Sequence, residues 1–135
     1  MMQDVLKMIY IGQGLYIDVW VWSVVEKRHK PILLMFDTGA SITTLSPDVL
    51  NLLGYTTPLS SKAKIVTASG VEISSRFLVN SVKLGSLEVE DVEVYSHNFP
   101  EESFSTGVVG LNVLRNFDIE LLFSENLIKF RKTEG

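Results

Sequence analysis

The chain of 135 residues contains no cysteine, which excludes disulfide bonds, thiolate chemistry and cysteine-based metal sites. Basic residues are also few, because 12 lysines and arginines stand against 16 aspartates and glutamates. This negative balance argues against nucleic acids and anionic membrane surfaces as partners. His29 and His97 are isolated, and the sequence has no His-Glu-x-x-His motif or carboxylate cluster with ligand spacing. We therefore expect no metal site and no cofactor.

A long uninterrupted apolar segment is missing as well. The stretch 8–25 is rich in apolar residues, but Gln13, Asp18 and two glycines interrupt it. No span of about 20 apolar residues therefore exists for a transmembrane helix. The N-terminus also lacks the basic segment, apolar core and small-residue cleavage site of an export signal. We expect a cytoplasmic protein that has no membrane partner.

Apolar residues are abundant, at 46% of the chain, and the charged residues are spread along its length. This composition predicts a single globular domain over residues 1–135. β-branched and aromatic residues dominate between closely spaced turn signals, which is typical of a mainly β protein. The predicted strands are 15–25, 31–36, 62–68, 71–79, 81–84, 87–95, 107–110, 118–122 and 127–131.

Two short helices are predicted between these strands. The first covers 47–53, because Ser46 can cap its start through its hydroxyl and Gly54 can adopt the left-handed conformation at its end. The second covers 111–117, where apolar residues at three-residue spacing would share one helix face.

The sequence Asp37-Thr38-Gly39-Ala40-Ser41 occurs once, directly after an apolar run that ends at Phe36. The carboxylate of Asp37 is therefore expected where a buried strand breaks into a loop. A charged group at that place is costly unless it is hydrogen-bonded or takes part in chemistry. Asp37 then either closes a turn through its side chain, which is a common structural role, or is catalytic.

Three blocks of the sequence, taken in order, resemble the retropepsin-like aspartic proteases, especially their bacterial single-domain members. The first block, 33–41, is an apolar strand followed by Asp-Thr-Gly. The second, within 65–79, is a predicted hairpin at the place of the family's mobile flap. The third, 108–114, reads Val-Val-Gly-Leu-Asn-Val-Leu and is similar to the family's apolar-apolar-Gly strand and following helix. The likeness covers about residues 15–131, and the ordered set is far more specific than Asp-Thr-Gly alone.

The resemblance implies a closed, barrel-like β fold of the acid protease type, with one short helix near the C-terminus. It also implies an obligate homodimer, because the family's chemistry needs two aspartates and this chain supplies one such motif. Asp37 of each subunit would meet its copy on the two-fold axis. Two carboxylates about 3 Å apart cannot both ionise, so they share one proton. One carboxylate would then activate a water while the other protonates the carbonyl of a peptide or protein substrate.

The resemblance also assigns roles to the residues that follow Asp37. The Thr38 hydroxyl would bond to the loop of the partner subunit. Gly39 would allow a sharp turn close to the carboxylates. Ala40 and Ser41 would line the floor of the cleft and offer backbone polar groups to an extended substrate.

Two further groups of residues receive roles from the same resemblance. A flap tip would close over the extended peptide and exclude water, and a buried strand would support the active loop from beneath. Outside the family context, the first group is an ordinary hairpin and the second an ordinary core strand. The flap tip would be Ala68, Ser69 and Gly70, and the supporting strand Val108, Val109 and Gly110.

The chain departs from the retroviral pattern at two positions. Retroviral enzymes usually place an acid after Asp-Thr-Gly-Ala and an arginine after the apolar-apolar-Gly strand, and these two residues pair near the dimer interface. Ser41 and Leu111 occupy those positions here, so the dimer needs other contacts. In the family the terminal strands interleave between subunits, and 127–130 is the expected contributor. The departures motivate an alternative function, a non-catalytic dimerisation or peptide-binding module that retains the protease fold.

Overall fold

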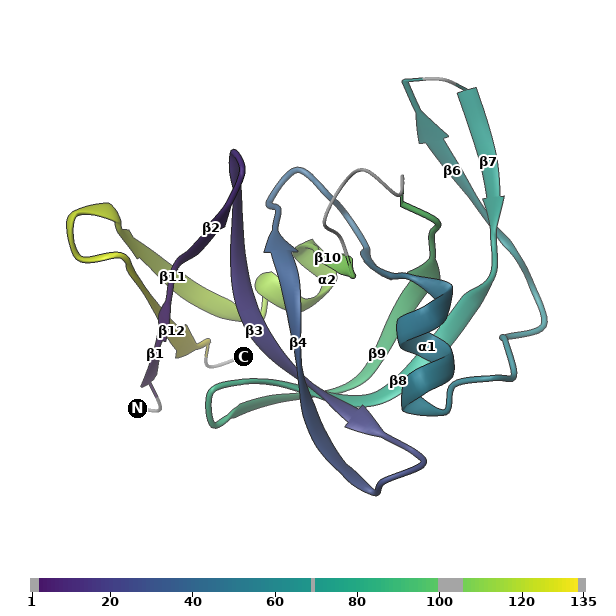
Figure 1. Ribbon diagram of the computed structural model, residues 1–135, viewed down its shortest axis with the longest axis horizontal. Helices are drawn as coiled ribbons and strands as arrows, with labels where there is room; N and C mark the ends of the chain where they lie inside the picture. Colours follow the sequence, from purple (N-terminus) through teal and green to yellow (C-terminus); the bar gives the residue numbers. More distant parts are fainter. Residues whose placement is uncertain (1–2, 69, 100–105, 134–135) are drawn as a thin grey trace.

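A computed structural model describes residues 3–68, 70–99 and 106–133, and these residues form a mainly β fold, as predicted (Figure 1). Six strands close into a barrel, because each pairs with its neighbour and β3 also pairs with β8. A further strand, β2 (Ile9–Ile11), extends this sheet beside β3. In order around the barrel the six are β3 (Gly14–Ser23), β4 (Arg28–Phe36), β10 (Gly107–Val109), β5 (Thr43–Leu45), β9 (Leu87–Ser96) and β8 (Arg76–Leu84).

The inside of the barrel is the apolar core of the molecule. Successive side chains of a strand point to opposite faces, and this alternation turns Ile17, Val19 and Val21 of β3 inward, where they are almost completely buried. Leu34 of β4 and Val109 of β10 are buried in the same core. The apolar runs that predicted buried strands are therefore the walls of one barrel.

One parallel pairing in the barrel determines where the Asp-Thr-Gly loop lies. β10 is inserted between β4 and β5, and it runs parallel to β4 with Val109 opposite Phe36. Because the two strands run in the same direction, the residues that follow them, Asp37 and Gly110, leave the barrel side by side. Segments more than 70 positions apart in the sequence thus meet at one end of the barrel.

The helix α1 (Pro47–Leu53) begins and ends where the sequence predicts. The Ser46 hydroxyl accepts a hydrogen bond from the N–H of Val49 (3.2 Å), and Gly54 ends the helix with a φ of +91°. The second helix, α2 (Leu111–Leu114), is one turn long, so the prediction that it extends to residue 117 is wrong. No helix in the described ranges is long and apolar enough to cross a membrane.

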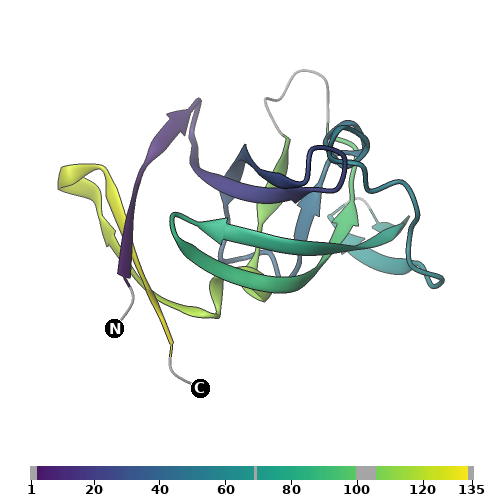
Figure 2. The same cartoon turned by 90° about the horizontal axis from the view of Figure 1, so that it is seen from below.

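A second sheet of three antiparallel strands lies beside the barrel (Figure 2). It contains β1 (Gln3–Lys7), β12 (Leu127–Lys132) and β11 (Phe117–Leu122), with β12 in the middle. Both edges of β12 are therefore occupied by strands of its own chain. A partner strand cannot pair with 127–130 unless it displaces β1 or β11, and the interleaving of this segment between subunits stays a prediction.

The predicted flap is a separate two-stranded hairpin formed by β6 (Ala63–Thr67) and β7 (Gly70–Ser74), which extends away from the barrel in Figure 1. The prediction of one strand over 71–79 is wrong, because the chain breaks at Ser75 and then continues as β8 of the barrel. Thr67 pairs with Gly70, so Gly70, which was expected in the turn, is the first residue of β7. Ser69 lies outside the described residues.

Candidate active site

Asp37 is the first residue after β4, and its backbone continues the pairing with β10. Its N–H donates to the carbonyl of Val109 (3.2 Å), and its Oδ1 accepts a hydrogen bond from the N–H of Gly39 (2.8 Å). The turn through the aspartate side chain, predicted as the structural alternative, is therefore present. The other carboxylate oxygen makes no hydrogen bond to any residue that the structure describes. Because the side chain is only half-buried, that oxygen remains available for chemistry.

The rest of the loop faces outward. Thr38, Gly39 and Ser41 are exposed, and Ala40 is half-buried. The Thr38 hydroxyl has no hydrogen-bond partner within the described part of the chain. An exposed hydroxyl without an internal partner is compatible with the expected bond to a second subunit, although one chain alone cannot form that bond.

Gly110 is the point of closest approach between β10 and the active loop. A Cβ atom at this position would lie 2.7 Å from the carbonyl oxygen of Ala40 and 2.8 Å from that of Ile42. Both atoms belong to the backbone, so they cannot move aside as the end of a flexible side chain could. Glycine is required here because the two backbones pack directly against each other. Val109 is fully buried beneath the loop, while Val108 is half-buried.

The start of α2 fixes the second half of the loop. The first N–H groups of a helix have no partner within the helix and must find one elsewhere. In this chain Leu111 donates to the carbonyl of Ala40 (2.8 Å), and Asn112 donates to the carbonyl of Ser41 (3.2 Å). The helix start and the loop therefore satisfy each other's backbone groups, and the structure brings 37–41 and 108–110 together as one unit.

Two residues that contact this unit, Thr43 and Asn112, were not predicted as site residues from the sequence. The Thr43 hydroxyl donates to Oδ1 of Asn112 (2.8 Å) and accepts from the N–H of Gly110 (3.1 Å). The Thr43 N–H donates to the same Oδ1 (2.8 Å). The available signal was a lone amide side chain in the apolar run 111–114, since a buried polar group normally has a specific partner.

The flap hairpin contributes an exposed apolar face. Val66, Val71 and Ile73 are 81%, 64% and 68% exposed. Their positions in the ladder place all three on the same side of the hairpin, because Val66 is directly opposite Val71. Ala68 is also exposed, and Gly70 has a φ of +132°, which favours glycine.

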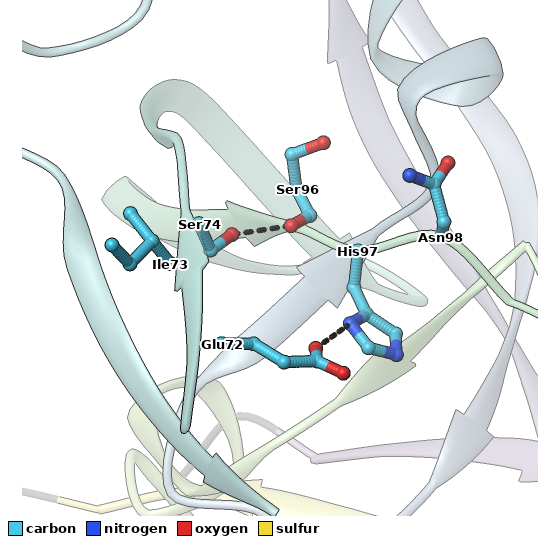
Figure 3. Close-up of a pocket in the computed structure, with 6 residues that line it drawn as sticks. All are labelled: Glu72, Ile73, Ser74, Ser96, His97 and Asn98. Carbon is cyan, nitrogen blue, oxygen red and sulfur yellow. Dashed lines mark hydrogen bonds and ion pairs between the residues drawn. The ribbon is translucent and has the colours of Figure 1, made fainter. Parts of the chain in front are cut away.

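The opposite side of the hairpin is tied to the last residue of β9 and to the segment that follows it (Figure 3). The carboxylate of Glu72 pairs with Nδ1 of His97 (3.4 Å), and the Ser74 hydroxyl donates to the carbonyl of Ser96. These residues, with Ile73 and Asn98, line a cavity of about 380 Å³. None of the residues 37–41 lines this cavity, so it belongs to the attachment of the flap and not to the loop.

Both histidines have protein partners, although the sequence suggested isolated side chains. His29 Nε2 lies 2.8 Å from the hydroxyl of Ser81, and burial lowers the pKa of His29. His97 pairs with Glu72 as described above. Among the described residues, no group of three or more histidine, aspartate or glutamate side chains is arranged to hold a metal ion.

The positions that depart from the retroviral pattern carry no charge in the folded chain. Ser41 is exposed, and the apolar side chain of Leu111 is 38% exposed beside the loop. The surface next to Asp37 therefore offers an apolar contact where the retroviral pattern has an ion pair.

Comparison with known proteins identifies the family. The sequence model described as "gag-polyprotein putative aspartyl protease" matches residues 25–116, which is more than half of the chain. The chain belongs to this aspartyl protease family. The matched segment includes the Asp37 loop, the flap hairpin, β10 and α2. A comparison with curated proteins found no match.

A solved structure shows the same fold. The crystal structure of a retropepsin-like aspartic protease from Rickettsia conorii superimposes with a TM-score of 0.68, at 19% sequence identity. The match covers 96% of this chain and 92% of the other. The barrel, the terminal sheet and the flap hairpin therefore form a retropepsin-like fold, as the sequence resemblance implied.

Proposed function

We propose that the protein is an aspartic endopeptidase that acts as a symmetric homodimer, with the two Asp37 carboxylates paired across the axis. One observation carries the proposal. Asp37 lies at the end of a core strand, in a loop whose backbone is fixed by β10 and α2, and one of its carboxylate oxygens is not used by the described part of its own chain. The membership in an aspartyl protease family supports the same function.

The chemistry follows from the pairing of two equal acids. At contact distance, the two carboxylates hold one proton between them, and the pair titrates as a unit. The ionised member removes a proton from a water molecule, which attacks the peptide carbonyl carbon. The protonated member donates its proton to the carbonyl oxygen. Collapse of the resulting tetrahedral species breaks the C–N bond as the nitrogen receives a proton, and the shared proton is restored.

The substrate would be an extended segment of peptide or protein that lies between the loop and the flap hairpin. Such segments are recognised mainly through main-chain hydrogen bonds, and pockets for side chains set the preference. The exposed apolar face of the flap, formed by Val66, Val71 and Ile73, offers a surface for apolar substrate side chains. The tip residues Ala68, Ser69 and Gly70 would close over the peptide and exclude water.

The test replaces Asp37 by asparagine, which keeps the shape of the side chain and removes its ionisation. Purified wild-type protein and Asp37→Asn are assayed against a mixed peptide library from acid to neutral pH. We expect loss of at least about 10³-fold in kcat, because the removal of a central catalytic group leaves only minor contributions. Asp48→Asn, which removes an exposed carboxylate from α1, is the matched control and should retain full activity.

Equal turnover by wild type and Asp37→Asn would refute catalysis by this residue. Sedimentation gives an independent check, since a protein that stays monomeric at assay concentration cannot pair two copies of Asp37. The alternative function, a dimeric peptide-binding module, is favoured by the uncharged surface at Ser41 and Leu111. It predicts a dimer that binds extended peptides and shows no turnover sensitive to an aspartic protease inhibitor.

A further inference from the structure

Besides the apolar strand 108–110, two polar residues make hydrogen bonds that support the active loop. We infer that Thr43 and Asn112 are positioning residues that hold the Asp37 loop in its reactive geometry. The inference rests on the proposed function, because it assigns these residues a role in aligning the paired carboxylates. Its evidence is a set of hydrogen bonds within one chain, which can be measured whether or not the protein cleaves peptides.

The junction of β10 and α2 holds both ends of the active loop. Both hydrogen-bonding groups of one peptide unit take part. The carbonyl of Val109 accepts from the N–H of Asp37, and the N–H of Gly110 donates to the hydroxyl of Thr43. Asp37 begins the loop, and Thr43 is the first residue of β5 after it. The spacing between the two ends is therefore set by one peptide unit of the β10–α2 junction.

Asn112 connects Thr43 and the active loop to the barrel strand β9. Its Oδ1 accepts from both the N–H and the hydroxyl of Thr43, and its Nδ2 donates to the carbonyl of Glu93 on β9 (2.8 Å). Its main-chain N–H donates to the loop carbonyl of Ser41. The amide side chain can both accept and donate, whereas an ionised aspartate has no donor and leucine has neither group.

If the hydroxyl of Thr43 is removed, no other group takes over its hydrogen bonds. Thr43 is 2% exposed, so solvent does not reach its hydroxyl to take its place. Without that hydroxyl, the N–H of Gly110 would lose its partner and Oδ1 of Asn112 would lose one of two donors. A buried polar group left without a partner is costly, and the structure responds by moving. Each subunit of a dimer would transmit such a shift to its own Asp37, so the paired carboxylates would be misaligned from both sides.

The experiment compares three substitutions on one short strand. Thr43→Val keeps the branched shape and removes the hydroxyl, whereas Thr43→Ser keeps the hydroxyl. Thr44→Val is the matched control, because the neighbouring Thr44 is half-buried and its hydroxyl has no hydrogen-bond partner among the described residues. Steady-state kinetics on one peptide substrate separate kcat from KM for each variant.

We expect Thr43→Val to lower kcat by roughly 10- to 100-fold, which is the effect of a small misplacement of catalytic groups. KM should change by less than about threefold, because the flap and its apolar face are untouched. Thr43→Ser should restore most of the lost kcat, and Thr44→Val should match wild type. A merely structural role would instead lower the amount of folded protein and leave kcat per folded molecule unchanged, and that result would overturn the inference.

Amide hydrogen exchange provides a readout that needs no activity. In Thr43→Val we expect faster exchange at Gly110 and Leu111, whose N–H groups contact the loop region, with no change at Leu50 in α1. Unchanged exchange at Gly110 and Leu111 would overturn the inference even if the wild type has no peptidase activity. Where Thr43→Val does not fold, Asn112→Asp takes its place, because it keeps the acceptor for Thr43 and loses the donor to Glu93. Absence of turnover in the wild type would refute the proposed function alone.

Discussion

The active loop and the flap hairpin are attached to the same barrel in opposite ways. Backbone hydrogen bonds to β10 and α2 hold the loop at Asp37, Ala40 and Ser41, and its polar support at Thr43 is buried. The hairpin pairs with no other strand of the described chain and carries three large apolar side chains on its surface. This fold therefore separates a loop that is fixed to the barrel by backbone hydrogen bonds from a hairpin that few contacts hold.

Local stability in proteins follows such differences. Segments with few buried contacts open at low free energy, whereas core segments open only with the whole molecule. If the protein acts as proposed, the loop must keep two carboxylates at contact distance and belongs to the second kind. The hairpin must then admit a peptide and belongs to the first. The comparison therefore makes predictions that differ in size between the two regions.

The largest effect is expected from Gly110→Ala, in the fixed region. The added Cβ would lie 2.7 Å from the carbonyl oxygen of Ala40, so the loop or β10 must move. We expect a loss of about 3 kcal/mol or more in the free energy of unfolding, as for other overpacked buried sites. Urea denaturation of the purified variant measures this loss.

The matched variant in the hairpin is Gly70→Ala. Nothing lies within 4 Å of a Cβ atom at Gly70, so the cost comes from its φ of +132° alone. We expect about 1–2 kcal/mol, lost locally from the hairpin and not from the barrel. A larger global loss of stability for Gly70→Ala than for Gly110→Ala would contradict the difference in attachment between the two regions.

An intermediate effect is expected at the terminal sheet, which combines both kinds of attachment. Ile128 and Phe130 of β12 are fully buried in the core, while Asp4 of β1, opposite Phe130, fastens the sheet to the barrel through Ser86. The carboxylate of Asp4 accepts hydrogen bonds from the N–H and the hydroxyl of Ser86 (2.7 and 2.8 Å). The bond from the Ser86 backbone is the main cause that lowers the pKa of Asp4, and burial opposes it.

The sign of the pH effect follows from this lowered pKa. A carboxylate with a lower pKa in the folded state stabilises the protein above its unfolded pKa, and the stabilisation is lost as pH falls through the folded pKa. We expect Asp4→Asn to cost about 1 kcal/mol at pH 7, a modest value because the contact is exposed. The difference from wild type should shrink below about pH 4. An equal difference at pH 7 and pH 3 in denaturation experiments would contradict this account.

Much of the fold could be predicted because local chemistry decided it. The helix 47–53 has its cap and its terminating glycine in the sequence, and the barrel strands are apolar runs between turns. The strand Thr43–Leu45 could not be predicted, because three residues are too few for a periodic pattern. The helix 111–117 was predicted too long, since Phe117 is buried against Phe130 at the start of β11 and not on a helix face.

The candidate site likewise has a part that could be predicted from the sequence and a part that could not. The Asp37 loop and the Val108–Gly110 strand were found because short motifs mark them. Thr43 and Asn112 were not found, because their partners lie 69 positions apart and only the insertion of β10 between β4 and β5 brings them together. Segment 127–130 was expected to contribute to a sheet between subunits, and the sequence does not reveal that β1 of the same chain occupies an edge of β12.

The smallest effect on global stability is expected from Glu72→Gln, in the hairpin. The change removes the charge that faces His97 across 3.4 Å, and both side chains are partly exposed. Such pairs contribute about 0–1 kcal/mol, so the free energy of unfolding should change by less than about 0.5 kcal/mol. The amides of β6 and β7 should nevertheless exchange faster, because the contact between Glu72 and His97 is one of the few that fasten the hairpin to the segment after β9.

The matched control is Glu90→Gln, which removes an exposed carboxylate from the barrel strand β9. It should leave exchange in the hairpin unchanged. If the protein cleaves peptides as proposed, Glu72→Gln should alter KM more than kcat, the reverse of the pattern expected for Thr43→Val, because the flap binds substrate and the loop performs the chemistry. If both variants changed the same kinetic constant, alignment and closure would not be separate properties of the two regions.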